Sequence, residues 1–475
     1  MSSSPPSSER TDLASLLALT AAILLRVRNG ESLSQILPQQ AAPLRPALQA
    51  LSFYVMRYLG RAQALRQILL SKKAPNPKVA ALLDVSLCLL SASDYLALEK
   101  NDPAYAQVNH EWAQQRVPAY DDFTIVNQAV EATQAHKKTA AFKGLINACL
   151  RRYLREKQRL LATLWQQEEV KFAFPQWWIA QIKEDYPQQW QQILIQSNQA
   201  GPLWLRVNQR LISVTKFCQH LQAAHIAHLA FDDVAVLILK ATPLADLPGF
   251  QEGWFAVQDW AAQQVNQILP LRNGQRVLDA CAAPGGKTAH LLEQYELDLW
   301  ALDRDAQRLQ RIQENLQRLH LLPEQNPNLG QTRVRVQVAD ATHAQAWFEG
   351  PAFDAILADV PCTGTGVVRR HPDMKWLRRP SDIQQTVALQ RQIVSALWPT
   401  LAVGGRLLYM TCSVLAQEGE AQAHYFSQHL VGAKRLEAPG QLLPGQDQWL
   451  GKPPASLAPE VSHDGFFYAL FEKVN

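Results

Sequence analysis

Cysteine is scarce in this 475-residue chain, and its spacing suits neither a disulfide framework nor a metal centre. The six cysteines are scattered over the whole length, and no two of them form a Cys-x-x-Cys pair, the spacing that is typical of structural zinc sites. Reduced thiols are the simpler interpretation and are usual in the cytosol. We therefore expect no bound metal and a cytoplasmic location.

Long hydrophobic runs are missing as well. The apolar segment Leu13–Leu25 has 13 residues, whereas a helix that spans a bilayer needs about 20. It follows a start rich in Ser and Pro, with no basic run beyond Arg10 and no small-residue cleavage site after it, so it is also a poor signal peptide. We expect a buried amphipathic helix here and no membrane partner.

Neither sign of charge dominates the composition. Lys and Arg together number 46, and Asp and Glu number 42, which gives a formal net charge of +4. Nucleic-acid-binding proteins and many metabolic enzymes share this balance. An RNA ligand therefore has to be argued from local patches.

The length predicts two or three domains, because a single hydrophobic core stops growing at about 250–300 residues. Residues 1–10 are polar, and we expect a flexible tail. Residues 11–167 carry apolar side chains three and four positions apart, as in Ile125–Ala132. This spacing predicts an all-α N-terminal domain.

A small mixed α/β connector is expected over residues 168–250. Phe174–Trp178 (FPQWW) breaks the helical pattern, while Leu203–Asn208 and Val234–Leu239 have the composition of short strands.

Residues 251–475 alternate apolar strands with amphipathic helices. Such alternation predicts a doubly wound, mostly parallel, Rossmann-like sheet with helices on both faces. Ligands bind beyond the carboxyl ends of the strands in these sheets, and several expected strands end at Asp303, Asp340, Asp359 or Cys412. The expected strands are Arg276–Ala280, Leu297–Asp303, Val334–Asp340, Phe353–Asp359, Arg406–Cys412 and Gly465–Phe471.

The first of these strands runs into a small-residue loop, in the sequence Val277–Thr288 (VLDACAAPGGKT). Glycines let the backbone approach a ligand, and a helix N-terminus offers free N–H groups. A phosphate-binding P-loop needs a glycine five positions before its Gly-Lys pair, where this chain has Cys281, and no GxGxxG is present. The loop therefore predicts a nucleoside pocket that is neither of these two types.

Two acids complete the expected pocket. Asp303 ends the next strand, 24 residues after Asp279, at a distance where an acid accepts hydrogen bonds from a ribose in other nucleoside-binding α/β folds. Asp340 has the equivalent place one strand further on and would hold an adenine amino group. A surface acid at a strand end is the alternative for each residue.

Two cysteines follow expected strands, in Asp359–Gly366 (DVPCTGTG) and Tyr409–Ser413 (YMTCS). Most cysteines in cytosolic proteins are small core residues, but two at the ligand edge of one sheet favour chemistry. A thiolate that adds to carbon 6 of cytosine makes the ring enamine-like, so that carbon 5 can attack a sulfonium methyl group; a base then removes the carbon 5 proton and the thiol is expelled. Asp359 is placed to hydrogen-bond ring nitrogen 3 and the exocyclic amine.

These segments resemble the RNA 5-methylcytosine methyltransferase family, in particular its bacterial small-subunit (16S) rRNA enzymes that carry a NusB-like N-terminal domain. The resemblance is dense from Val257 to the C-terminus. The matching segments are Ala282–Thr288 (AAPGGKT), Asp359–Gly366, Gly366–Arg379 (GVVRRHPDMKWLRR), Tyr409–Leu415 (YMTCSVL) and Asp464–Ala469 (DGFFYA).

The resemblance implies S-adenosylmethionine as cofactor, Cys412 as nucleophile and Cys362 as an aid to product release. Val360 stands where the family usually has Ala and Thr363 where it has Ser, and neither change removes a catalytic group. The cofactor contacts carried over are Cys281, Ala282, Ala283, Pro284, Gly285, Gly286, Lys287, Asp303, Asp340 and Asp359.

The cationic segment, residues 367–379, directly follows the Cys362 loop and contains an aromatic residue. Cations attract phosphates, and a tryptophan can stack on a base or pack into the fold. A solvated basic loop is the alternative to RNA contact. The predicted RNA contacts are Arg369, Arg370, His371, Lys375, Trp376, Arg378 and Arg379. The target base must leave its stack to reach Cys412.

Ile125–Glu131 and Phe142–Arg155 resemble the NusB-like segments of the family more faintly, and their usual interpretation is RNA binding and target selection. The basic residues near the end of that stretch, Arg151 to Arg159, fit a solvated helix face equally well.

Three functions remain open at this point. The first is methylation of a 16S rRNA cytosine by a monomeric enzyme. The second is the same chemistry on tRNA or 23S rRNA, because these motifs read the cytosine and not its surroundings. The third is a non-enzymatic RNA-binding factor, which has no need of the two thiols.

Overall fold

The computed structural model describes residues 12–70, 74–114, 117–240, 242–324, 326–445 and 461–475. The expected flexible tail, residues 1–10, lies outside this range. The chain divides into a helical unit, residues 1–199 with 368–379, and a second unit, residues 200–367 with 380–475. Among the described residues, no single helix is long and apolar enough to cross a membrane, although the bent pair Pro77–Leu90 and Ala92–Asn101 together meets that test of length and composition.

The helical unit buries one face of each long helix. In α9, Ile146, Leu150 and Tyr153 are buried and lie three or four residues apart, as expected of an amphipathic helix. The helices of this unit are α1 (Leu13–Arg28), α2 (Leu33–Ile36), α3 (Arg45–Leu69), α4 (Pro77–Leu90), α5 (Ala92–Asn101), α6 (His110–Gln114), α7 (Asp122–Ala132), α8 (Lys137–Ala140), α9 (Lys143–Leu164), α10 (Glu168–Lys171), α11 (Gln176–Asp185), α12 (Trp190–Asn198) and α17 (Met374–Leu377).

The helices extend beyond the all-α region expected over residues 11–167. They continue through α12, and the helical unit ends at Gln199; the domain bounds at 168 and 250 stay a prediction. The expected break at Phe174–Trp178 is confined to its first two residues, because Pro175 is the N-cap of α11 and both tryptophans lie in that helix. Proline suits a helix start, where its missing N–H is not needed.

The second unit begins with a small antiparallel sheet in the order β2-β3-β1-β4. Its elements are β1 (Leu203–Val207), α13 (Val214–Ala223), β2 (His228–Ala230), β3 (Ala235–Ile238) and β4 (Phe255–Val257). Phe217 and Leu221 of α13 pack on Leu205 and Val236 of the sheet. The strands β1 and β3 were expected, whereas β2 and β4, each only three residues long, carry too short a pattern to be recognised.

The larger sheet has seven strands in the order β10-β11-β9-β8-β5-β6-β7. Five of them, from β9 to β7, are parallel, and β11 and β10 are added antiparallel at one edge. The strands are β5 (Arg276–Asp279), β6 (Asp298–Asp303), β7 (Arg333–Val338), β8 (Phe353–Asp359), β9 (Leu401–Thr411), β10 (Ala433–Leu442) and β11 (Phe466–Lys473). This arrangement confirms the predicted doubly wound, mostly parallel sheet. The strand β10 was not expected, and its pairing is irregular between Leu436 and Gly440.

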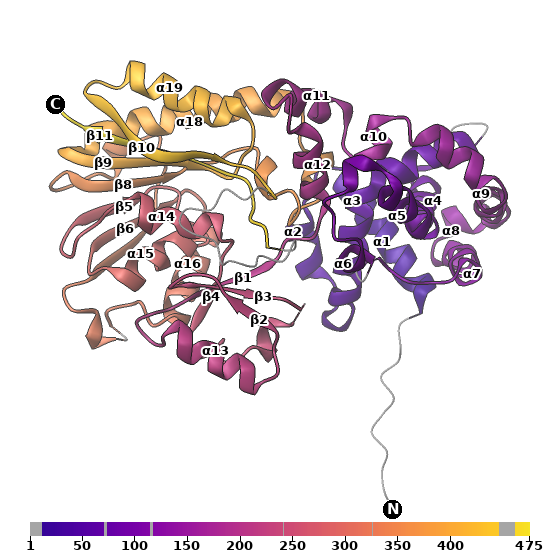
Figure 1. The fold of residues 1–475 in the computed structure, drawn as a ribbon, viewed down its shortest axis with the longest axis horizontal. Coiled ribbons are helices and arrows are strands. Elements are labelled where there is room, and N and C mark those ends of the chain that lie inside the picture. The colour runs from indigo at the N-terminus through magenta and orange to yellow at the C-terminus, as the bar shows by residue number, and fades with distance from the viewer. Residues whose placement is uncertain (1–11, 71–73, 115–116, 241, 325, 446–460) are drawn as a thin grey trace, which may run out of the picture. The chain divides into compact units, whose positions relative to one another are not determined.

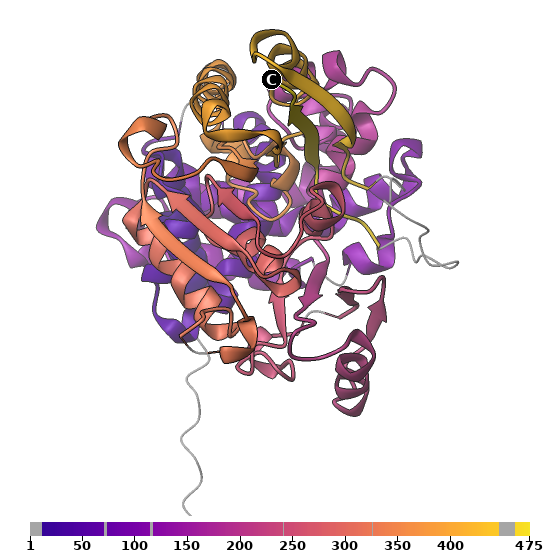
Figure 2. The same ribbon diagram turned by 90° about the vertical axis from the view of Figure 1, so that its left-hand side faces the viewer.

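Helices cover both faces of this sheet (Figures 1 and 2). Val277 packs in the core with α15 (Gly286–Gln294) and α16 (Ala306–Arg318), while its neighbour Leu278 packs in the core with α18 (Pro380–Leu397) and α19 (Glu420–His429). The short helix α14 (Val265–Ile268) lies on the α15 side. Successive side chains of a strand point to opposite faces, so two cores enclose the sheet and leave the carboxyl ends of its strands for a ligand site.

Candidate active site

The loop after β5 turns sharply into α15. Gly285 caps the helix with φ of 91°, a left-handed conformation that side chains other than glycine rarely adopt. A Cβ there would lie 3.1 Å from the Cα of Ile312 in α16. Glycine is therefore required both for the turn and for the close approach of α15 to α16.

Asp303, the last residue of β6, is turned toward this loop. Its Oδ2 accepts a hydrogen bond from the Ala283 N–H at 3.3 Å, and its Oδ1 accepts one from the Asp305 N–H at 3.0 Å. Arg308 lies across the same edge, with its guanidinium 3.5 Å from Asp303 Oδ2. The carboxylate is thus held at the loop with further lone pairs available for ribose hydroxyls.

Asp340 lies two residues beyond the end of β7 rather than at its last residue. Its Oδ1 accepts hydrogen bonds from the N–H and the hydroxyl of Thr342, and these bonds lower the Asp340 pKa. The side chain is about half exposed, at 48%. It is therefore less enclosed than Asp303, and its Oδ2 lies 3.7 Å from Nδ1 of His343.

Asp279, at the end of β5, was not among the predicted contacts. Burial raises its pKa to about 7. Thr288 donates a hydrogen bond to Oδ2 at 2.6 Å, whereas Oδ1 is buried without a hydrogen-bond partner among the described residues. An unsatisfied buried oxygen is unusual, and together with Asp303 and the N–H groups of the loop it makes a donor and acceptor set that fits a nucleoside cofactor.

Cys281 lies in the loop between β5 and α15. Burial first, and the neighbouring carboxylates second, raise the pKa of its thiol well above the usual range. The thiol therefore stays protonated and is not suited to act as a nucleophile.

The two strand-end cysteines meet. Cys362 Sγ lies 3.4 Å from Cys412 Sγ, although 50 residues separate them in the chain. The Gly366 N–H donates to the Cys412 carbonyl at 3.0 Å, and the Gly465 N–H donates to the Gly366 carbonyl at 2.9 Å. The hydrogen bond to Cys412, together with burial, raises the pKa of the Cys362 thiol well above its usual range. One proton on Cys362 can therefore point at the Cys412 sulfur.

Lys287 was predicted as part of the cofactor loop, but its amine reaches Asp359 at the end of β8. Its Nζ lies 2.5 Å from Asp359 Oδ2 and 5.7 Å from the ring centroid of Phe466. Burial lowers the pKa of a lysine, but the negative charge of Asp359 more than offsets this and raises the Lys287 pKa. A cation and a carboxylate thus lie beside the thiol pair.

A buried arginine, which belongs to no motif recognised in the sequence, donates hydrogen bonds to α15. Arg206 of β1 is 0% exposed, and its guanidinium donates to both oxygens of Glu293, at 2.7 and 2.6 Å. The same group donates to the Gly286 carbonyl at 2.8 Å. Because Gly286 and Glu293 lie at the two ends of α15, Arg206 fixes the helix whose N-terminus faces the pocket. A lone Arg in an apolar strand was the signal that sequence reasoning passed over.

The cationic segment was predicted to contact RNA, but two of its residues, Lys375 and Arg369, are buried instead. It belongs to the helical unit. Lys375 is 1% exposed, and its Nζ donates to Arg57 O, Ala173 O and Asn198 Oδ1 at 2.6, 2.9 and 2.7 Å. An ammonium has three donors, so none is left for a phosphate.

Arg369 is the second buried residue of the segment, whereas Trp376 is half-buried. The Trp376 Nε1–H donates to Met56 O at 2.8 Å, and Arg369 is 1% exposed. Arg369 is therefore not presented for phosphate contact, while the Trp376 ring keeps part of its surface exposed. RNA contact stays a prediction for the remaining residues of the set, of which His371 and Arg379 are exposed and Arg370, Trp376 and Arg378 are half-buried.

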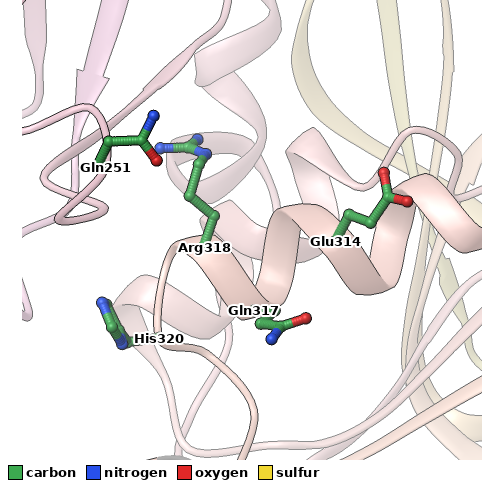
Figure 3. Close-up of a pocket in the computed structure, with 5 residues that line it drawn as sticks. All are labelled: Gln251, Glu314, Gln317, Arg318 and His320. Atoms are coloured by element: carbon green, nitrogen blue, oxygen red, sulfur yellow. The ribbon is translucent and has the colours of Figure 1, made fainter. Parts of the chain in front are cut away.

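A polar cavity of about 630 Å³ opens elsewhere in the second unit. Figure 3 shows Glu314, Gln317 and Arg318 rising from one helix, α16, with His320 and Gln251 completing the lining. The Arg318 guanidinium donates to the carbonyls of Phe250 and Phe255 and so holds this part of the fold together. None of the predicted site residues lines this cavity. No cluster of metal-ligating side chains occurs in the part of the chain that the structure describes.

Two models of known protein families match this chain. Residues 266–472 match the family model of the 16S rRNA methyltransferase RsmB/F, and residues 174–245 match that of the RsmF/B-like ferredoxin-like domain. The ribosomal RNA small subunit methyltransferase B of Vibrio cholerae is 36% identical over 470 residues, which cover 96% of each chain. The protein of the same name from Pasteurella multocida is 37% identical over 98% of each chain.

Two solved structures share the fold. PH0851 matches with a TM-score of 0.68 and 21% identity over 99% of this chain and 100% of that chain. NSun6 from Pyrococcus horikoshii, solved with SFG, matches with a TM-score of 0.52 and 20% identity over 64% of this chain and 99% of that chain.

Proposed function

The chain belongs to the 16S rRNA methyltransferase RsmB/F family, whose members are S-adenosylmethionine-dependent RNA methyltransferases, and from this premise we propose that it methylates carbon 5 of a cytosine in small-subunit rRNA. The attacking group is the Cys412 thiolate. The observation that carries the proposal is the 3.4 Å contact between the Cys362 and Cys412 sulfurs beside Asp359 and Lys287. The names of the relatives support the choice of rRNA.

The residues that would hold the cofactor are Asp303, Asp340, Asp279 and the backbone of the loop between β5 and α15. When bound, S-adenosylmethionine supplies an electrophilic sulfonium methyl group. The carboxylate of Asp303 would bind ribose hydroxyls, and Asp340 would bind the adenine amino group. Arg206 keeps the N-terminus of α15 in register with them.

The first role of the protein is to activate the base. The Cys412 thiolate forms a bond to carbon 6 of the cytosine, and the electron pair of the 5,6 double bond makes carbon 5 nucleophilic. Asp359 accepts from the exocyclic amine, and the nearby Lys287 ammonium stabilises negative charge that moves onto the ring. The Cys362 thiol, whose pKa is raised, stays protonated beside the Cys412 sulfur, and in this proposal Cys412 is the sulfur that attacks.

The second role is release. A base takes the carbon 5 proton, the electrons of that C–H bond restore the 5,6 double bond, and the bond between carbon 6 and Cys412 Sγ breaks with its electrons on sulfur. The S–H of Cys362 stabilises the departing thiolate by hydrogen bonding. Cys362 is thus the group that keeps the adduct short-lived.

The function is tested by incubating the enzyme with labelled S-adenosylmethionine and separate 16S rRNA, 23S rRNA and tRNA, followed by bisulfite sequencing. We expect label in 16S rRNA at one cytosine. Label confined to tRNA or 23S rRNA would keep the chemistry and overturn the target. Absence of both label and S-adenosylmethionine binding by calorimetry would instead support a non-enzymatic RNA-binding factor.

A further inference from the structure

A buried carboxylate lies behind the thiol pair without a role in the chemistry described so far. Glu418, at the end of the short 3-10 helix Ala416–Glu418, is 0% exposed. Among the described residues it has no ion-pair partner. A buried carboxylate is costly unless hydrogen bonds satisfy it, so its position calls for a purpose.

The hydrogen bonds of this carboxylate come from the Cys362 loop and from the helix that supports it, α18. The Thr363 N–H donates to Oε1 at 2.9 Å, and the Thr363 hydroxyl donates to Oε2. From α18, the Thr386 hydroxyl and the Gln390 amide donate to Oε1 at 2.7 and 3.1 Å. The same Gln390 amide donates to the Pro361 carbonyl at 3.0 Å. Cys362 is therefore held from the residue before it and from the residue after it.

The network continues to the other cysteine. Ser413, which follows Cys412, lies with its hydroxyl 2.9 Å from that of Thr365 and 3.4 Å from that of Thr363. The Tyr409 hydroxyl, from β9, donates to the Glu418 carbonyl at 2.8 Å. All these side chains are buried, and a fully satisfied buried network fixes one arrangement of the groups that it joins.

From this geometry we infer that Glu418 is a positioning residue that sets Cys362 against Cys412 and keeps Cys362 as the protonated member of the pair. The role of Cys362 in release rests on the proposed function, but the state of the two thiols does not. The negative charge of Glu418 also opposes a second negative charge on Cys362, and it contributes to the raised pKa of that thiol.

The test compares the thiols of the full-length protein directly. Iodoacetamide alkylation of Cys362 and Cys412 is followed by mass spectrometry as a function of pH, in the wild type, in Glu418→Gln and in Glu420→Gln. Glu420 is a matched control, because it is a glutamate two residues away that is 61% exposed and pairs with Arg435. We expect the Cys362 profile to move to lower pH in Glu418→Gln and to stay in place in Glu420→Gln.

Catalysis gives the second readout. Glu418→Gln is expected to lower kcat by on the order of 10- to 100-fold, since small misplacements of catalytic groups have such effects, with KM for RNA unchanged. An unmoved Cys362 profile in folded Glu418→Gln overturns the inference. A moved profile with unchanged kcat supports the inference and overturns the release role of Cys362 instead.

If Glu418→Gln fails to fold, Glu418→Asp keeps the charge but withdraws it by one methylene group. It should move the profile in the same direction by less, and an unmoved profile in this variant also overturns the inference.

Discussion

The Cys362 loop and the cationic segment are consecutive in the chain, but their polar side chains have different surroundings. In the loop, Cys362 meets Cys412, and the carboxylate and ammonium beside them, Asp359 and Lys287, remain partly exposed. In the cationic segment, Lys375 donates all three of its hydrogen bonds to oxygens of the helical unit. A charged residue type therefore does not distinguish a ligand-binding group from a structural one; the partners of its donors do.

The largest effect is expected at the nucleophile. Cys412→Ala should lower methyl transfer by at least about 10³-fold, because the proposed reaction begins with the bond between Cys412 Sγ and carbon 6. Rates are measured with labelled S-adenosylmethionine, and thermal melting should stay within a few degrees of the wild type. A variant that kept near-wild-type activity would contradict the assignment of Cys412 as the nucleophile.

Asp359→Asn sharpens the same side of the comparison. The carboxamide cannot neutralise Lys287 or hold the cytosine edge in the same way, and we expect kcat to fall by about 10²-fold or more. The readout is single-turnover methyl transfer at saturating RNA. A change confined to KM would make Asp359 a binding residue alone.

Lys375→Ala tests the structural side. Loss of three buried hydrogen bonds and of the stem that fills the space around them should lower the stability of the helical unit by about 3 kcal/mol or more. Calorimetry or limited proteolysis reports this change. Weaker RNA binding with unchanged stability would show that this lysine serves RNA after all.

Arg379→Ala should have the smallest effect. Its side chain is exposed, and exposed substitutions usually change stability by no more than about 0.5 kcal/mol. If it contacts a phosphate, RNA affinity falls modestly, and the slope of log affinity against log salt falls by about 1. An unchanged slope would remove Arg379 from the RNA contacts.

The place of the site at the carboxyl ends of the strands could be predicted, because every parallel sheet of this type has the same arrangement. Parallel strands bring their carboxyl ends to one edge, so a motif that places Asp303, Asp359 and Cys412 after apolar strands also places them together. The irregular strand β10 escaped because a Pro and a Gly interrupt its pattern. Arg206 and Glu418 were missed because each looks like an ordinary polar residue, and only the fold reveals the hydrogen-bond partners around it.

The account centres on the bond between Cys412 and carbon 6 of the target base, and the covalent adduct tests it most directly. Cys362→Ala protein is incubated with 16S rRNA and S-adenosylmethionine, digested, and searched by mass spectrometry for a cytidine attached to a peptide. The account predicts that the adduct accumulates and that the modified peptide contains Cys412. An adduct on any other residue, or rapid turnover with no adduct, would contradict it.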